Sequence, residues 1–252
     1  MDFFTGLLSE RVASDNVLRK VGALIDWRRV GLKVGKVRSQ LGRSGYDVDL
    51  MLRVLLLGQW HSLSDRKLEE ALRVRLDFML FCGASLFEHV PDHRTICRFR
   101  CALVRLGLFD AVLNEVNRQL SAHGLKVEHA AVAVVDATVI ESAGRPPRRL
   151  IEGIAVDRAE EAVEGAAGGV VTECLWADPD GCWSQSGRNL YFGHKSFWRS
   201  DGEGYVERVL VRPANEGEAP HLPHLLKGCT AVRVLADKAY SSKTNRAVLA
   251  QQ

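Results

Sequence analysis

The apolar residues of this chain change their spacing once, near Val127. Before that point they recur every three or four positions, which is the spacing of one face of a helix. After it, EHAAVAVVDATVIES (128–142) is dense in alanine and β-branched residues, which is typical of a buried strand. The chain is therefore predicted to be α/β, with a helical domain over 1–127 and a sheet-containing domain over 128–252.

The first domain is predicted to contain a series of short amphipathic or buried helices, over 48–60, 63–83, 91–107 and 108–124. Ser64 or Asp65 is a suitable N-cap for the second of these helices. Arg94, Arg98 and Arg105 share one face of the third. Short helices with a basic helix among them are typical of a helix-turn-helix-like DNA-binding domain, and equally of an ordinary helical bundle.

Charge is distributed unevenly between the two halves. Residues 1–128 carry 20 Lys and Arg against 15 Asp and Glu, whereas residues 129–252 carry 14 against 16. A basic first half is compatible with a polyanionic partner, although a solvated helical surface has the same composition. No apolar run is long enough to span a membrane, so no membrane partner is expected.

The six cysteines form no CxxC pair, which favours reduced, mostly buried thiols in a cytoplasmic protein. Cys97 and Cys101 lie one helical turn apart, with His93 one turn earlier. A metal site is one interpretation of this spacing, but a helix face turned toward the core is the favoured one.

The second domain is predicted to follow the order strand, irregular insertion, strand, strand, helix, strand and helix, over 128–142, 143–187, 189–198, 204–214, 216–228, 231–236 and 242–252. The first strand is expected to end near Asp136, and the last strand ends at Asp237. Crossover connections are right-handed, and ligands bind at the carboxyl ends of strands in such sheets. We therefore expect these two strands to be neighbours, with the two carboxylates facing each other.

Two carboxylates held close together favour a divalent cation, because like charges cannot both stay ionised without compensation. Oxygen ligands favour Mg²⁺ or Mn²⁺, and two such ions about 3.5–4 Å apart activate an attacking oxygen and stabilise a leaving oxygen in phosphodiester chemistry. Asp136 and Asp237 therefore predict a metal-dependent nuclease or strand-transfer site. The alternative for each of them is a turn former or a helix cap.

Several blocks in order resemble one family: YDVDLMLRVLLLGQWHSLSDRKLEEALRVRLDFMLFCG, PDHRTICRFRCAL, VVDATVIES, DPDGCW, LYFGHKSF, VLVRPANEGE and ADKAYSS. The chain is similar to bacterial insertion-sequence transposases of the DDE type (the IS-five lineage), which have a ribonuclease-H-like core. Asp136 and Asp237 match the family's first two catalytic aspartates, although the family usually has Gly where Ala239 stands. The resemblance implies a helical DNA-binding and dimerisation domain followed by a mixed β-sheet catalytic core.

The resemblance also implies a reaction. Such an enzyme binds the terminal inverted repeats of its element, cuts the DNA with metal-activated water, and joins the freed 3′ hydroxyl to target DNA. It would use two Mg²⁺ or Mn²⁺ ions, act as a homodimer on paired ends, and work in the cytoplasm on the nucleoid.

The family's third catalytic acid is a glutamate on a helix that follows the second aspartate. Residues 238–252 contain neither Asp nor Glu, and Glu141, Glu216 and Glu218 lie before Asp237. We therefore expect a catalytic core truncated at its C-terminus, and no Mg²⁺-dependent end cleavage by residues 1–252.

Five basic residues are expected to contact DNA. Arg94, Arg98 and Arg100 lie on the basic helix, and Lys195 and Lys238 lie near the predicted active end. A solvated surface charge is the alternative for each. Two other functions remain open at this point, a DNA-binding module or transposition repressor without catalysis, and a metal-dependent nuclease that does not join strands.

Overall fold

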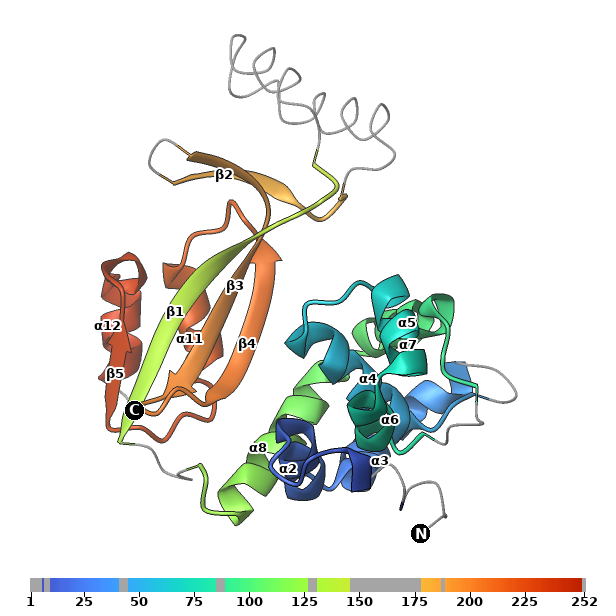
Figure 1. Cartoon of the computed structure of the whole chain (residues 1–252). Helices are drawn as coiled ribbons and strands as arrows, with labels where there is room; N and C mark the ends of the chain where they lie inside the picture. The colour runs from blue at the N-terminus through green and yellow to red at the C-terminus, as the bar shows by residue number, and fades with distance from the viewer. Residues whose placement is uncertain are drawn as a thin grey trace. The chain divides into compact units, whose positions relative to one another are not determined.

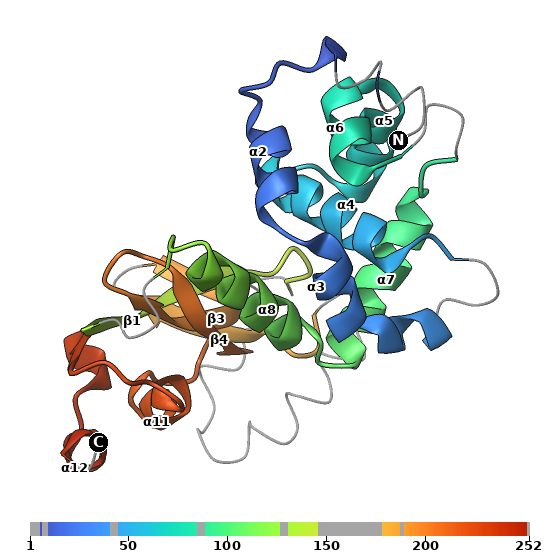
Figure 2. The same cartoon turned by 90° about the horizontal axis from the view of Figure 1, so that it is seen from below.

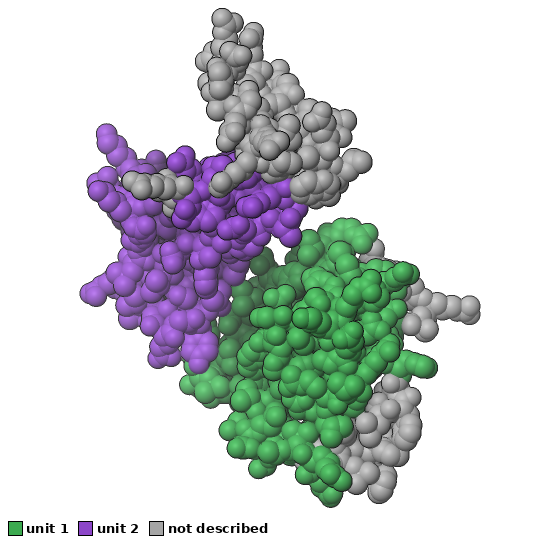
Figure 3. All heavy atoms as spheres, turned by 45° about the horizontal axis from the view of Figure 1, so that its top comes forward, with its two compact units in different colours: residues 1–128 green, residues 129–252 purple. Residues whose placement is uncertain are grey.

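The computed structural model describes residues 6, 10–40, 45–84, 89–126, 131–145, 178–186 and 189–250. Two compact units, residues 1–128 and residues 129–252, make up the chain (Figures 1 and 3). The first is built from helices and the second around a five-stranded sheet. The chain therefore combines helix and sheet, as the change in apolar spacing predicts. None of the helices in the described ranges is long and apolar enough to cross a membrane.

The helical unit is a succession of short helices: α2 (Val17–Leu24), α3 (Trp27–Lys33), the 3-10 helix η1 (Gly35–Gln40), α4 (Val48–Trp60), α5 (Asp65–Val74), α6 (Leu76–Cys82), α7 (His93–Arg105) and α8 (Phe109–Ala122). Helix α4 has the bounds that its apolar run predicts. Its residues Leu57 and Val54 are fully buried, together with Phe78, Phe99 and Leu103 from neighbouring helices. These side chains belong to one large apolar cluster, which is the core of the unit.

Residues 63–83 form two helices instead of the single helix predicted from their apolar stripe. The chain is extended at Arg75, between α5 and α6 (φ −90°, ψ 113°). The Arg75 guanidinium donates two hydrogen bonds to Asp77, at 3.0 and 2.6 Å, and lies over the Phe78 ring. Ser64 caps α5 as predicted, its hydroxyl accepting from the amide of Lys67 at 3.4 Å. The break is thus held by side-chain contacts that an apolar stripe does not encode.

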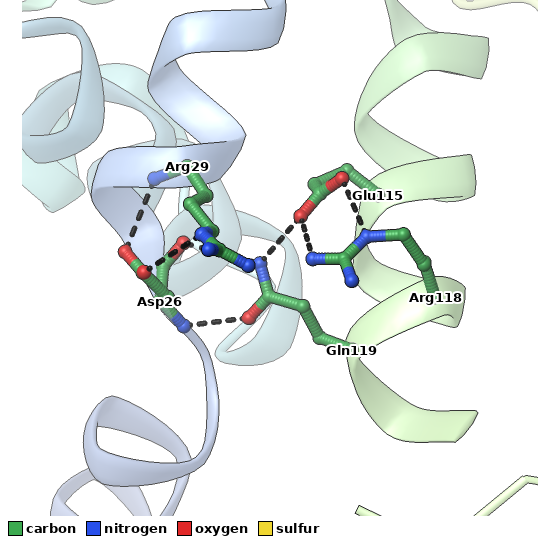
Figure 4. A network of polar contacts seen from close by, with 5 residues as sticks. All are labelled: Asp26, Arg29, Glu115, Arg118 and Gln119. Carbon is green, nitrogen blue, oxygen red and sulfur yellow. Dashed lines mark hydrogen bonds and ion pairs between the residues drawn. The ribbon is translucent and has the colours of Figure 1, made fainter. Parts of the chain in front are cut away.

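A polar network fastens α8 to the start of α3 (Figure 4). The backbone amide of Asp26 donates to Gln119 Oε1 at 2.7 Å, and Gln119 Nε2 donates to Asp26 O at 3.2 Å and to Glu115 Oε1 at 3.0 Å. Arg118 donates to both Glu115 oxygens, at 3.0 and 2.7 Å. Both Glu115 and Gln119 are 5% exposed, so the hydrogen bonds compensate for the burial of these polar groups.

The sheet of the second unit contains β1 (Val132–Glu141), β2 (Cys182–Ser186), β3 (Asn189–Asp201), β4 (Val206–Pro213) and β5 (Arg233–Ala236). β1 and β4 each pair with β3 in antiparallel fashion, and β5 pairs with the other edge of β1 in parallel. β2 pairs with the first residues of β3. The crossover from β4 to β5 runs through the 3-10 helix η2 (Ala219–His221) and α11 (Leu222–Leu226). The 3-10 helix η3 (Lys238–Tyr240) and α12 (Lys243–Leu249) follow β5.

Two predictions about this sheet are wrong. β1 continues to Glu141, so Asp136 lies within the strand and not at its end. The strand persists because β3 pairs with it over its whole second half. β2 lies in 143–187, where only irregular structure was expected. This strand forms because it pairs with β3 in antiparallel fashion. Residues 146–177 of that insertion lie outside the described part of the chain.

The two faces of the sheet differ. One face packs against α11, where Val135 and Phe197 join Leu222, Leu225 and Leu226 in a small buried cluster. Figure 2 shows α11 and α12 on the same side of the strands. The other face carries large apolar side chains that are more than a third exposed: Ile140, Trp198, Val209, Val211 and Leu235. The core of this unit is therefore one-sided.

Candidate functional site

Asp136 and Asp237 lie side by side. The parallel pairing of β1 with β5 ends with Val135 opposite Ala236, so the next residue of each chain is one of the two aspartates. Both residues are exposed. Because β5 ends here, the described residues leave this edge of β1 unpaired from Asp136 onward. The register thus makes neighbours of the two residues that the sequence singled out.

Each aspartate is oriented by one backbone amide. Asp136 Oδ1 accepts from the amide of Ala137 at 2.8 Å. Asp237 is the N-cap of η3, and its Oδ1 accepts from the amide of Lys238. Each bond uses one carboxylate oxygen and fixes the side chain locally. The turn-forming role that was the alternative for Asp237 is therefore present, and it leaves the second oxygen available to a ligand.

Tyr240 is a buried residue of this site that sequence reasoning missed. Its side chain is 2% exposed and packs in the cluster under β1 and β3. Its hydroxyl has no hydrogen-bond partner among the described residues. Burial raises the pKa of Tyr240, and the negative charges of Glu218, Asp136 and Asp237 raise it further. The hydroxyl therefore lies in the combined field of three carboxylates.

Lys195 lies close to one of these three acids, Glu218. Its Nζ lies 3.8 Å from Glu218 Oε1 and donates to the backbone oxygen of Glu216 at 3.2 Å. The Lys195 side chain is only 16% exposed. Lys238, by contrast, is exposed directly after Asp237. Of the two lysines predicted to contact phosphates, Lys238 is thus the one presented to solvent.

The basic helix α7 presents two of its three candidate arginines to solvent. Arg94 and Arg98 are exposed and one turn apart, and Arg98 donates to Thr95 Oγ1 at 3.2 Å. Arg100 instead forms an ion pair with Asp65 of α5. The guanidinium of Arg100 is therefore engaged in joining two helices, which the sequence pattern of α7 alone does not reveal.

The two cysteines of α7 do not form a core face. Cys97 and Cys101 are both exposed, which contradicts the interpretation favoured by their spacing. The His93 ring is engaged elsewhere, because its Nδ1 lies 2.8 Å from Glu69 Oε2 of α5. This contact and the hydrogen bond from the His93 amide lower the pKa of Glu69.

The donor set at Asp136 and Asp237 consists of carboxylate oxygens, which suit Mg²⁺ or Mn²⁺. Among the described residues, no three His, Cys, Asp or Glu side chains are placed so that they could hold one ion together. Two protein ligands are compatible with Mg²⁺, which usually keeps several water ligands and binds through one or two carboxylates.

Comparisons with known proteins point in one direction. Residues 7–102 match a family described as a transposase domain (DUF772). The chain is also 41% identical, over 150 residues, to the transposase for insertion sequence element IS1106 of Neisseria meningitidis serogroup B. That alignment covers 59% of this chain and 49% of the relative, so the chain spans about half the length of the curated relative it matches. No solved structure matches the chain significantly. Both matches relate the chain to transposases.

Proposed function

We propose that this chain carries two metal-binding carboxylates, Asp136 and Asp237, of an insertion-sequence DDE transposase with a ribonuclease-H-like core. The observation that carries the proposal is the register of β1 with β5, which sets the two aspartates side by side. The matches to transposases support the same activity. The order β4, β3, β1, β5, with β5 alone parallel to β1, supports a ribonuclease-H-like sheet.

The residues of the site have distinct roles in this proposal. Asp136 and Asp237 hold Mg²⁺ or Mn²⁺, two ions in a complete site, and backbone amides keep their carboxylates in place. When bound, the metal activates an attacking oxygen and stabilises the charge on the leaving oxygen. Lys238, exposed beside Asp237, contacts a DNA phosphate.

DNA binding is assigned to α7. Arg94 and Arg98 offer two exposed guanidinium groups on one face of the helix, in the half of the chain with excess positive charge. The DNA would be the terminal inverted repeats of the element and its target, with two copies of the chain acting on paired ends. Arg100 contributes by holding α7 against α5 through Asp65.

A DNA-binding module without catalysis is the second candidate. The observation that favours it is that the described residues contain no group of three side chains able to hold an ion. In that case α7 alone would carry the function, for example as a repressor of transposition, and Asp237 would only cap the turn after β5.

A metal titration distinguishes the two candidates. Binding of Mn²⁺ to the 252-residue chain is measured by the electron paramagnetic resonance signal of free Mn²⁺. Asp136→Asn and Asp237→Asn should each weaken binding on the order of tenfold or more, because each removes a charged ligand. Asp180→Asn, in an exposed turn, is the matched control and should leave the affinity unchanged. Equal Mn²⁺ affinity in all four proteins would refute the metal site.

A DNA titration tests the role of α7. Binding to a short duplex of arbitrary sequence is measured by gel shift at several salt concentrations. The double variant Arg94→Ala/Arg98→Ala should bind more weakly, and its salt dependence should fall by about two phosphate contacts. Arg29→Ala, an exposed arginine of α3, serves as the control. An unchanged salt slope in the double variant would place the DNA contacts elsewhere.

A further inference from the structure

The turns that carry Glu218 and Asp237 are fastened together by one buried amide. Asn245 of α12 is 3% exposed, and its Nδ2 donates to Ala219 O at 2.8 Å and to Tyr240 O at 2.7 Å. Ala219 directly follows Glu218, and Tyr240 ends the 3-10 helix that Asp237 caps. Asn245 is itself fixed, because its amide donates to the N-cap Ser242 at 3.0 Å. Asn245 therefore joins the crossover to the turn that follows β5.

Tyr240 lies where this turn meets β1. Its ring is packed among Val135, Phe197 and the leucines of α11, so the direction of its hydroxyl is set by the core. The hydroxyl is buried and has no partner among the described residues, and the charged groups that act on it are Glu218, Asp136 and Asp237. A buried hydroxyl without a partner is costly, so a polar group that reached it would form a favourable hydrogen bond.

Lys195 supplies a positive charge close to Glu218. It approaches Glu218 from β3, at 3.8 Å, with a largely buried side chain. A separation of 3.8 Å leaves this pair without a close hydrogen bond, so the Glu218 carboxylate retains acceptor capacity. The Lys195 ammonium group therefore offsets part of the negative charge of Glu218 and leaves its carboxylate free to accept a further hydrogen bond.

We propose that Glu218 is a further acid of the Asp136–Asp237 site, which acts on the bound divalent cation through its charge and through a bridging water, with Asn245 as its positioning residue and Lys195 as its counter-charge. This inference rests on the proposed metal site and deepens it. Asn245 joins the turn of Glu218 to the 3-10 helix that Asp237 caps, directly after the end of β5. A water-mediated role agrees with the finding that no three described side chains converge on one ion.

Mn²⁺ binding to the 252-residue chain tests the role of Glu218. Glu218→Gln should weaken the affinity on the order of tenfold, which is typical of the loss of an outer-shell partner. Glu203→Gln, in the exposed turn between β3 and β4, is the matched control and should bind as the unmodified chain does. Lys195→Met should have the opposite sign and tighten binding several-fold, because it removes a repelling charge.

A double variant separates a direct effect of Glu218 from one transmitted by Lys195. In the Lys195→Met background, Glu218→Gln should still weaken Mn²⁺ binding on the order of tenfold. If Glu218→Gln loses its effect in that background, Glu218 only restrains Lys195 and the proposal is overturned. If Glu218→Gln has no effect at all while Asp136→Asn and Asp237→Asn do, the proposal fails and the two-aspartate site stands. If the two aspartate variants also bind as the unmodified chain does, the metal site itself fails.

Asn245→Ala tests positioning apart from folding. It should weaken Mn²⁺ binding several-fold at a temperature well below its melting temperature, because the turns of Glu218 and Asp237 come apart. Leu210→Ala, at the rim of the same apolar cluster, is the destabilised control and should lower the melting temperature without weakening Mn²⁺ binding. If Asn245→Ala binds Mn²⁺ as tightly as Leu210→Ala does, Asn245 has only a structural role and its part of the proposal is overturned.

Discussion

The helical unit and the sheet unit bury their apolar residues in different ways. In the helical unit, one large cluster collects side chains from α2 to α7, and the partly buried residues of α8 pack against it. In the sheet unit, a small cluster lies under one face, and the other face exposes Trp198, Val209 and Val211. The acidic site lies where the small cluster ends, at Tyr240. The helical unit thus has a large apolar core, whereas the candidate site of the sheet unit lies at the margin of a small one.

The largest expected effect compares the two cores directly. Phe99 and Phe197 are both fully buried, one in each unit. Phe197→Ala and Phe99→Ala should each cost about 3–5 kcal/mol of the free energy of unfolding of their own unit. Because the cluster around Phe197 is small, we expect Phe197→Ala to unfold the sheet unit while the helical unit stays folded.

Hydrogen exchange read by mass spectrometry follows each unit separately. Phe197→Ala should remove protection from β1, β3 and β4 and leave α4 and α7 protected, and Phe99→Ala should affect only the helical unit. Loss of protection in both units from either substitution would contradict the view that each core stands alone.

The sequence predicted much of the helical unit because its signals are local. The apolar run from Val48 to Trp60 gave the bounds of α4, and Ser64 gave the cap of α5. The break at Arg75 was missed, since it depends on the pairing of Arg75 with Asp77 and on stacking over Phe78. The spacing of apolar residues does not predict such polar contacts.

The site was predictable only in part. Asp136 and Asp237 were identified because each follows an apolar run, and their adjacency follows from parallel pairing. The contacts of Tyr240 and Asn245, on which the proposal for Glu218 rests, were missed because they join the crossover to α12, with Asn245 and Ala219 26 residues apart. A single sequence contains the residues of such a contact but does not show that the fold brings them together.

A smaller effect concerns the polar network of the helical unit. Hydrogen bonds from Arg118, and then from Gln119, hold the pKa of Glu115 at about 2 against the opposing effect of burial. The folded-state pKa lies below the unfolded value, so this network stabilises the unit above about pH 4.5, and its contribution is lost as the pH falls toward 2. We expect about 2 kcal/mol, because Arg118 is half exposed and solvent screens part of the interaction.

Urea unfolding at several pH values measures this contribution, with Glu115→Gln as the comparison. The difference in free energy of unfolding between the two proteins should be about 2 kcal/mol at pH 7 and should shrink as the pH falls below 4.5. Other carboxylates titrate equally in both proteins and cancel in the difference. A difference that is independent of pH would show that Glu115 is held by packing and not by its charge.

The smallest expected effect comes from making the same substitution, Val to Thr, on each of the two faces of the sheet. Val135 is 2% exposed against α11, and Val209 is 38% exposed on the other face. Val135→Thr buries a hydroxyl without a partner and should cost about 1–2 kcal/mol. Val209→Thr should cost less than about 0.5 kcal/mol, because its hydroxyl stays in water and threonine suits a strand. Urea unfolding of both variants measures the asymmetry. Equal costs would mean that the exposed face is covered in solution, and the one-sided core would then have to be replaced by a sheet buried on both faces.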